Sequence, residues 1–145
     1  MIIGIGTDIV HLPRIARILA QRETRFLARA FHPDEIMTYR QRLQSTRSDS
    51  AVSLSAVRFV ASRWAAKESV YKALGGQWRI PFPDIWIRQR DGDAKPEIAL
   101  VNDSAVRASA LGVAAWHVSL SHDGEYAIAM VIAQGQHPFV NTHGP

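Results

Sequence analysis

The chain has 145 residues, of which 47% are hydrophobic and 21% are charged, and it carries a net charge of +4. This length predicts one domain with a sizeable core and is too short to suggest two. The absence of cysteine excludes disulfides, thiolate metal sites and cysteine nucleophiles. No apolar run reaches the roughly 18 residues of a membrane span, and no export signal is recognisable, so we expect a soluble cytoplasmic protein.

Arginine supplies 14 of the 17 basic residues, and the isoelectric point is near 10. The guanidinium group recognises phosphate and carboxylate through a planar fork, so an anionic partner is expected. Charge alone fits nucleic acid, an acidic protein or a polyphosphate metabolite equally well.

The first ten residues, MIIGIGTDIV, predict a buried strand. Asp8 shares one face of this strand with Gly4 and Gly6. Glycine inside a strand marks the close approach of a ligand or of another backbone. The glycines therefore either leave room beside the carboxylate or relieve crowding in the core.

Two helices are predicted next. The first follows Pro13, and a break within residues 21–24 is an alternative to a continuous helix. The second starts at residues 32–35 and turns Ile36, Tyr39 and Leu43 inward. The serine-rich residues 45–55 predict a loop.

The longest helical pattern covers residues 56–74 and ends at Gly75-Gly76. Two hairpins are predicted, one around residues 91–93 and one around Asp123-Gly124, with a short helix at 103–111 between them. Helices and antiparallel hairpins without βαβ alternation indicate an α+β fold. We expect one domain, residues 1–133, and a flexible tail, residues 134–145; the strand order cannot be derived.

Glu68 and Lys72 stand one turn apart, the spacing of an ordinary surface ion pair. Their apolar neighbours predict a largely buried helix, where charges are costly. Asp8 and Glu68 are the kind of carboxylate pair that binds Mg²⁺ together with substrate phosphates, and Lys72 is placed to reach a phosphate oxygen. These are the parts of a phosphoryl-transfer site, although no Walker or kinase motif is present.

Three segments, GIGTDIV, RFVASRWAAKESVYKA and HVSLSHDGEYAIA, carry a family resemblance. From Met1 to about Ala133 the chain resembles the bacterial holo-acyl-carrier-protein synthases, the small class of 4′-phosphopantetheinyl transferases. The ordered combination is highly specific, whereas either half alone is weak. The resemblance implies the phosphopantetheinyl transferase fold, an antiparallel sheet packed on a long central helix, with one domain per subunit.

The resemblance also implies an activity, the transfer of 4′-phosphopantetheine from coenzyme A to a serine of an acyl carrier protein or carrier domain. Adenosine 3′,5′-bisphosphate is released, Mg²⁺ is required, and the reaction serves fatty acid biosynthesis. Asp8 and Glu68 become the metal ligands and Lys72 the cationic partner of the coenzyme A pyrophosphate. Glu68 is also the expected proton acceptor for the serine, directly or through a water.

The resemblance places His122 in the coenzyme A site, with Arg63 as a weaker candidate for the nucleotide phosphates. The alternatives are a histidine beside a turn and an arginine that forms an ordinary salt bridge or is solvated. Five arginines of the first predicted helix lie within an arc of about 140°, which indicates either a solvated face or a docking stripe for an acidic carrier protein. The members closest to the family's docking positions are Arg14, Arg22 and Arg25.

The small members of this family are homotrimers with active sites between subunits, so we expect the same here. The loop at residues 75–79 is shorter than in many relatives, and the loop at 45–55 is longer. Two competing functions remain. One is a basic nucleic-acid-binding module, which would not need Asp8 or Glu68. The other is a metal-dependent phosphohydrolase, which would use water as the nucleophile. We expect neither a nucleic acid nor a membrane as partner.

Overall fold

The computed structural model describes residues 1–44, 53–76, 79–89 and 95–136. Helices and strands alternate irregularly, in the order β1 (Ile2–His11), α1 (Leu12–Ala30), α2 (Pro33–Gln44), α3 (Leu54–Ala73), η1 (Phe82–Asp84), β2 (Ile85–Gln89), β3 (Pro96–Leu100), α4 (Asn102–Ala110), β4 (Val113–Asp123) and β5 (Tyr126–Gly135). The predicted α+β class is confirmed. No helix within these residues is both long and apolar enough to cross a membrane.

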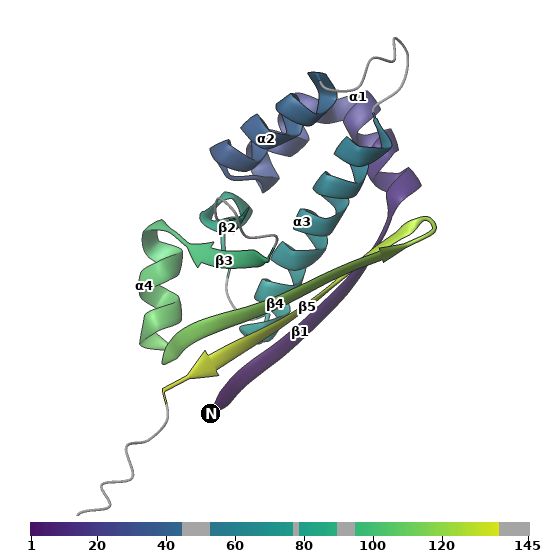
Figure 1. Ribbon diagram of the computed structural model, residues 1–145. Coiled ribbons are helices and arrows are strands. Elements are labelled where there is room, and N and C mark those ends of the chain that lie inside the picture. The colour runs from purple at the N-terminus through teal and green to yellow at the C-terminus, as the bar shows by residue number, and fades with distance from the viewer. Residues whose placement is uncertain (45–52, 77–78, 90–94, 137–145) are drawn as a thin grey trace, which may run out of the picture.

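The strands form two antiparallel sheets, one with the order β1-β5-β4 and one that pairs β2 with β3. Helix α3 packs against one face of the three-stranded sheet, and α1 and α2 gather around its N-terminal half (Figure 1). The expected packing of an antiparallel sheet on a long central helix is therefore present. The last strand, β5, lies in the middle of the sheet, between β1 and β4.

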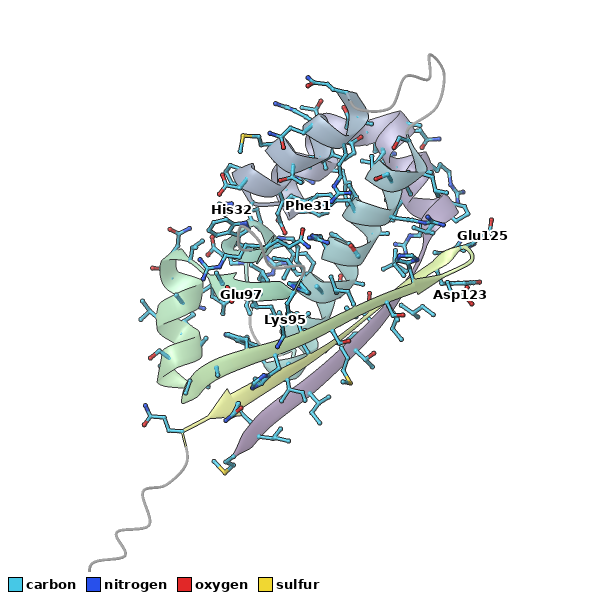
Figure 2. The ribbon with its side chains drawn as sticks, in the orientation of Figure 1. Phe31, His32, Lys95, Glu97, Asp123 and Glu125 are labelled. Atoms are coloured by element: carbon cyan, nitrogen blue, oxygen red, sulfur yellow. The ribbon has the colours of Figure 1, made fainter. Side chains whose placement is uncertain are left out.

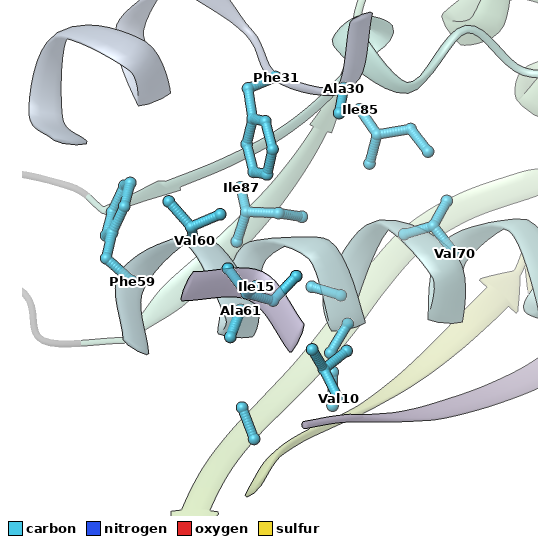
Figure 3. Close-up of a cluster of buried hydrophobic side chains, with 14 of the residues drawn as sticks. Val10, Ile15, Ala30, Phe31, Phe59, Val60, Ala61, Val70, Ile85 and Ile87 are labelled. Carbon is cyan, nitrogen blue, oxygen red and sulfur yellow. The ribbon is translucent and has the colours of Figure 1, made fainter. Parts of the chain in front are cut away.

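The core surrounds α3 on several sides. Its side chains Val60 and Val70 are fully buried, and residues from β1, α1 and β2 close around them. Figure 3 shows part of this cluster, including Val10, Ile15, Ile85 and Ile87. Because α3 is covered on nearly every side, the orientation of its few charged residues determines which of them reach solvent.

Two glycines bring α3 unusually close to β1. Gly4 and Gly6 face the helix, and a methyl group on either would overlap a backbone carbonyl oxygen, that of Ala73 or of Ser69 respectively. Of the two readings of these glycines, relief of crowding in the core is the one present, because the backbone of α3 lies against the strand at both positions. Asp8 lies farther along the same face, opposite Ala129 of β5.

The ends of the helices agree largely with expectation. Helix α1 has a kink at Arg22 (φ −146°, ψ 29°), inside the window where a break was considered. The Ser53 hydroxyl accepts a hydrogen bond from the Ala56 N–H at the start of α3, so the predicted loop ends earlier than residue 55. Gly75 and Gly76 end α3 with φ of +80° and +65°. Residues 45–52 and 77–78 lie outside the described residues.

Both predicted hairpins are present, although the turn at 90–94 is outside the described residues. In the second hairpin Asp123 pairs with Tyr126, and Gly124 has a φ of +51°. Figure 2 shows Asp123 and Glu125 at the tip of this hairpin. Strand β5 continues through Gly135, and residues 137–145 of the expected tail are outside the described part of the chain.

Candidate active site

The close contact between α3 and β1 places Lys72 beside Asp8. Lys72 Nζ donates hydrogen bonds to Asp8 Oδ1 at 2.8 Å and to the Thr7 carbonyl oxygen at 2.9 Å. The Asp8 side chain is only 18% exposed, whereas that of Lys72 is 48% exposed. The Asp8 carboxylate is therefore largely buried, whereas the Lys72 ammonium group is accessible to a ligand.

Glu68 lies one turn before Lys72 on the same helix. Partial burial raises the pKa of Glu68, and the negative charge of Asp8 raises it further, whereas Lys72 and Arg14 lower it. The charges of Asp8, Lys72 and Arg14 are therefore close enough to Glu68 to affect its ionisation. The predicted set of Asp8, Glu68 and Lys72 is thus brought together from positions sixty residues apart.

The carboxylate pair does not form a closed metal site by itself. Among the residues that the structure describes, no group of three or more histidine and acidic side chains could hold a metal ion. Mg²⁺, however, commonly uses one or two carboxylates and completes its shell with waters and substrate phosphates. Asp8 and Glu68 suit such an open, substrate-completed site.

Glu68 opens onto a cleft of about 990 Å³ between α1, α3 and residues 79–82, which we call the Glu68 cleft. One part of its lining is cationic and consists of Arg22, Arg25, Arg29 and Arg79. The remainder is mainly apolar and aromatic, with Ile18, Phe26, Ala30, Trp64, Ile80, Pro81 and Phe82. Two of the three predicted docking arginines line this cleft. Arg14 is outside the lining but close enough to affect Glu68, and Arg79 was not anticipated.

Arg63 and His122 line a different cleft of about 400 Å³, the Arg63 cleft. Arg42, Arg58 and three serines are also part of its lining. Burial lowers the pKa of Arg63 to about 10, so the guanidinium is still charged at neutral pH. Arg63 Nη1 donates a hydrogen bond to Ser62 Oγ at 3.3 Å. Within the part of the chain that the structure describes, Arg63 has no carboxylate in ion-pair contact, and the buried Nε atoms of Arg58 and Arg63 have no hydrogen-bond partner. Its guanidinium stacks 4.4 Å from the ring centroid of Phe59.

The two clefts face in different directions. Arg63 and Glu68 are five residues apart on α3, which corresponds to roughly 140° around a helix. The structure therefore does not place Arg63 or His122 with the carboxylate pair of the same chain. It does bring Arg63 and His122, sixty residues apart in sequence, into one cationic cleft.

The fully buried charges of α3 are not those that the sequence suggested. Glu68 is only partly buried and Lys72 is exposed, whereas Lys67 has no exposed surface and pairs with buried Glu35 of α2 at 2.8 Å. Adjacent residues on a helix point about 100° apart, so Lys67 faces the core while Glu68 faces the cleft. Glu35 lies at the predicted start of the second helix, and nothing local in the sequence linked it to Lys67.

Comparison with known proteins identifies the family of the chain. A family model described as the 4′-phosphopantetheinyl transferase superfamily matches residues 4–131. The chain belongs to this superfamily. A holo-[acyl-carrier-protein] synthase of Anaeromyxobacter dehalogenans is 39% identical over 141 residues, which is 95% of this chain and all of the relative.

Solved structures of holo-[acyl-carrier-protein] synthases have the same fold as this phosphopantetheinyl transferase. The enzyme of Neisseria meningitidis aligns with a TM-score of 0.78 at 30% identity, over 92% of this chain and 99% of that one. The Bacillus anthracis enzyme, solved in complex with CoA (3′,5′-ADP), aligns with a TM-score of 0.68 at 30% identity, over 94% and 99%. The family resemblance, the enzyme class and the fold expected from the sequence are confirmed.

Proposed function

We propose that this transferase moves 4′-phosphopantetheine from coenzyme A to a serine of an acyl carrier protein or carrier domain and releases adenosine 3′,5′-bisphosphate. The observation that carries the proposal is the convergence of Asp8, Glu68 and Lys72 beside a cleft rimmed by arginines. The coenzyme A complex of the Bacillus anthracis relative supports the choice of donor. Fatty acid biosynthesis and a cytoplasmic location remain predictions.

Asp8 and Glu68 would hold Mg²⁺, which supplies positive charge to the diphosphate of coenzyme A when it is bound. Lys72 has three N–H donors, of which Asp8 and the Thr7 carbonyl use two. The third is available to a diphosphate oxygen. Lys72 would thus orient Asp8 and stabilise charge on the leaving phosphate at the same time.

Glu68 is suited to accept the proton of the carrier serine. Because burial and Asp8 raise its pKa, its carboxylate is a stronger base than an ordinary glutamate. The serine Oγ would form a bond to the phosphorus adjoining pantetheine as the bond to the adenosine bisphosphate breaks. The hydroxyl proton passes to Glu68, directly or through a water.

The Arg63 cleft suits a phosphate of the nucleotide part of coenzyme A. It contains a buried guanidinium that lacks a carboxylate partner among the described residues, which is an arrangement that favours an anionic ligand. His122 at its rim adds a further donor. Because this cleft and the Glu68 cleft face apart, we propose that one coenzyme A molecule bridges the Glu68 cleft of one subunit and the Arg63 cleft of its neighbour.

The open face of the three-stranded sheet supports a homotrimer. Pairing across the strands places apolar side chains together on the face away from α3. These side chains are unusually exposed in the single chain, and they are Ile5 (58%), Ile9 (63%), Tyr126 (51%), Ile128 (42%) and Met130 (48%). A contiguous apolar patch of this kind is typical of a subunit interface.

Arg14, Arg22 and Arg25 are proposed to dock the carrier protein. Arg22 and Arg25 lie on the kinked helix α1 and share the Glu68 cleft with the proposed base, so a carrier held by them would present its serine close to Glu68. Acyl carrier proteins are acidic, and complementary charge steers association and fixes orientation.

Mass spectrometry tests this function directly. An apo carrier protein incubated with coenzyme A, Mg²⁺ and the enzyme is expected to gain one phosphopantetheine group. A panel of free carriers and carrier domains makes the test fair, because the partner is not specified by the structure. Absence of any mass gain across the panel would contradict the proposal.

The nucleic-acid-binding alternative is not favoured. Three of the arginines that it would use line the same cleft as Glu68, whose carboxylate repels phosphate unless a metal ion intervenes. Salt-dependent binding of DNA or RNA that does not need Asp8 or Glu68 would revive it.

A further inference from the structure

The motif W-A-A-K-E-S contains a charged residue that the proposed reaction does not use. Lys67 is completely buried, and its ammonium group donates to Glu35 Oε2 at 2.8 Å, to the Phe82 carbonyl oxygen at 3.0 Å and to the Ile85 carbonyl oxygen. It also lies 5.3 Å from the ring centroid of Phe31. All three donors of the ammonium group are therefore engaged.

Glu35 completes this network from the other side. Its Oε2 accepts the His32 N–H at 2.9 Å, and its Oε1 accepts the Ile87 N–H at 3.1 Å. Figure 2 shows Phe31 and His32 together at the junction of α1 and α2. One buried ion pair thus ties the start of α2, the middle of α3 and the segment around η1 to one another.

The segment held by Lys67 is also a wall of the Glu68 cleft. Phe82, whose carbonyl accepts from Lys67, lies 5.1 Å from Trp64 between ring centroids, and Trp64 lies 5.4 Å from Phe26. Arg79, Ile80 and Pro81 continue this wall directly before η1. The position of the wall relative to Glu68 therefore depends on two carbonyl groups bound to the residue next to Glu68.

We propose that Lys67 is a positioning residue, which holds residues 79–85 against α3 and so sets the width of the Glu68 cleft for the carrier protein. This inference rests on the proposed function, because it assigns the cleft to the carrier. Glu35 takes part by neutralising Lys67 and by fixing the backbone on both sides of the pair. Neither residue touches the reacting atoms.

The substitutions must separate anchoring from simple loss of stability. Lys67→Met alone leaves the Glu35 charge buried without its partner, which is expected to unfold the protein at lower temperature. Glu35→Gln combined with Lys67→Met removes both charges and is expected to recover much of that loss, yet it still lacks the donor for Phe82 and Ile85. Glu97→Gln, which breaks a partly exposed ion pair on the β2–β3 hairpin, is the control.

Kinetics then distinguish the two roles. In the double variant kcat/KM for the apo carrier is expected to fall about 10- to 100-fold, because a displacement of about 1 Å at a positioned site has an effect of that size. KM for coenzyme A is expected to change by a smaller factor, because residues 79–85 do not line the Arg63 cleft, which is proposed to hold the nucleotide part of coenzyme A. Removal of the negative Glu35 near Arg63 does not disfavour phosphate either. An equal fold-change in kcat/KM for the carrier and in KM for coenzyme A, or no change in kcat/KM for the carrier, would overturn the proposal.

Amide hydrogen exchange tests the anchoring without turnover. The Asp84 and Ile85 amides, which donate to Pro81 and Phe82 carbonyl oxygens, are expected to exchange at least about tenfold faster in the double variant, while that of Val131 in β5 is unchanged. Unchanged exchange at Asp84 and Ile85 would overturn the proposal. If the wild type transfers nothing, the proposed function fails, and exchange alone decides the anchoring.

A second variant covers the case in which the double variant does not fold. Phe82→Ala removes part of the cleft wall without touching the buried pair. It is expected to lower kcat/KM for the carrier in the same way, and KM for coenzyme A is again expected to change by a smaller factor. Wild-type kinetics in this folded variant would overturn the claim that the wall positions the carrier.

Discussion

Glu68 differs from an ordinary helical glutamate because two effects destabilise its negative charge. Burial and Asp8 both disfavour its ionised form, and only Lys72 and Arg14 favour it. A carboxylate in this position is better suited to bind a cation or accept a proton than to stabilise the fold. We therefore propose a functional role for Glu68, because an ordinary i, i+4 ion pair with Lys72 would not need Asp8 nearby.

Removal of either carboxylate is the first test at this scale. Glu68→Gln and Asp8→Asn are expected to reduce phosphopantetheine transfer by about 10²- to 10⁴-fold, the range typical for loss of a general base or a charged ligand. Circular dichroism should show that both variants stay folded. Full activity in either variant would remove that residue from the metal role.

The pKa of Glu68 also predicts a pH dependence of stability. Because its folded pKa is raised above the ordinary glutamate value, the protonated form is favoured by folding, and stability is lost as pH rises through the folded pKa. Glu68→Gln avoids this loss. In thermal unfolding without divalent metal, the melting temperature of the variant relative to that of the wild type should therefore rise from pH 4 to pH 8. A gap that is constant, or that closes with rising pH, would contradict the assignment.

At the scale of elements, the packing of α3 on β1 positions the carboxylate pair. Gly4 and Gly6 allow the helix backbone to contact the strand, and this contact carries Lys72 to Asp8. The buried pair of Lys67 and Glu35 acts on the opposite side of the same helix. Contacts on two sides thus fix the rotation of α3 about its axis. As a result Lys67 faces the core, whereas the adjacent Glu68 faces the cleft.

Gly6→Ala tests the first of these contacts. The added methyl group would overlap the Ser69 carbonyl oxygen, so α3 must move away from β1, and unfolding free energy is expected to fall by about 1–3 kcal/mol. Transfer should fall as well, because Lys72 and Glu68 move away from Asp8. Ala110→Ser, an exposed change on α4, should stay within about 0.5 kcal/mol of the wild type. Wild-type stability of Gly6→Ala would contradict the close packing.

Sequence reasoning was most successful where the signal is local. The helix end at Gly75 and the hairpin turn at Gly124 each depend on the left-handed backbone conformation that glycine adopts easily. Asp8 and Glu68 could be proposed as a pair because they belong to a recognisable ordered set of motifs, and the structure brings them together. Hydrophobic patterning identified α3 as buried but did not fix its rotation, because apolar residues surround the helix almost completely. Hydrophobic patterning therefore could not predict the buried pair of Lys67 and Glu35 or the separation of the two clefts.

At the scale of the whole molecule, the two faces of the sheet have different roles. One face packs on α3 and carries Asp8, while the other exposes a row of isoleucine, methionine and tyrosine side chains. Because the Glu68 cleft and the Arg63 cleft face apart in one chain, a homotrimer built on the open face would supply what each subunit lacks. Oligomerisation would then be a requirement for activity as well as for burial.

Ile9→Asp tests the interface. A charge on the open face is expected to shift the molecular mass measured by light scattering from about three times the chain mass toward the 16.1 kDa of one chain. Leu111→Asp is the matched control, because Leu111 is also an exposed apolar residue but lies at the end of α4. A wild type that is monomeric at micromolar concentration, or a trimeric Ile9→Asp variant, would contradict the proposed interface.

The most direct measurement is complementation between two inactive variants. Glu68→Gln removes the proposed base, and Arg63→Ala combined with His122→Ala removes the proposed phosphate cleft. If each site is shared by two neighbours, co-refolded mixed trimers contain sites that join an intact Glu68 cleft to an intact Arg63 cleft. Random 1:1 mixing then predicts recovery of about a quarter of wild-type transfer activity. A mixture as inactive as its two components would contradict an active site shared between subunits.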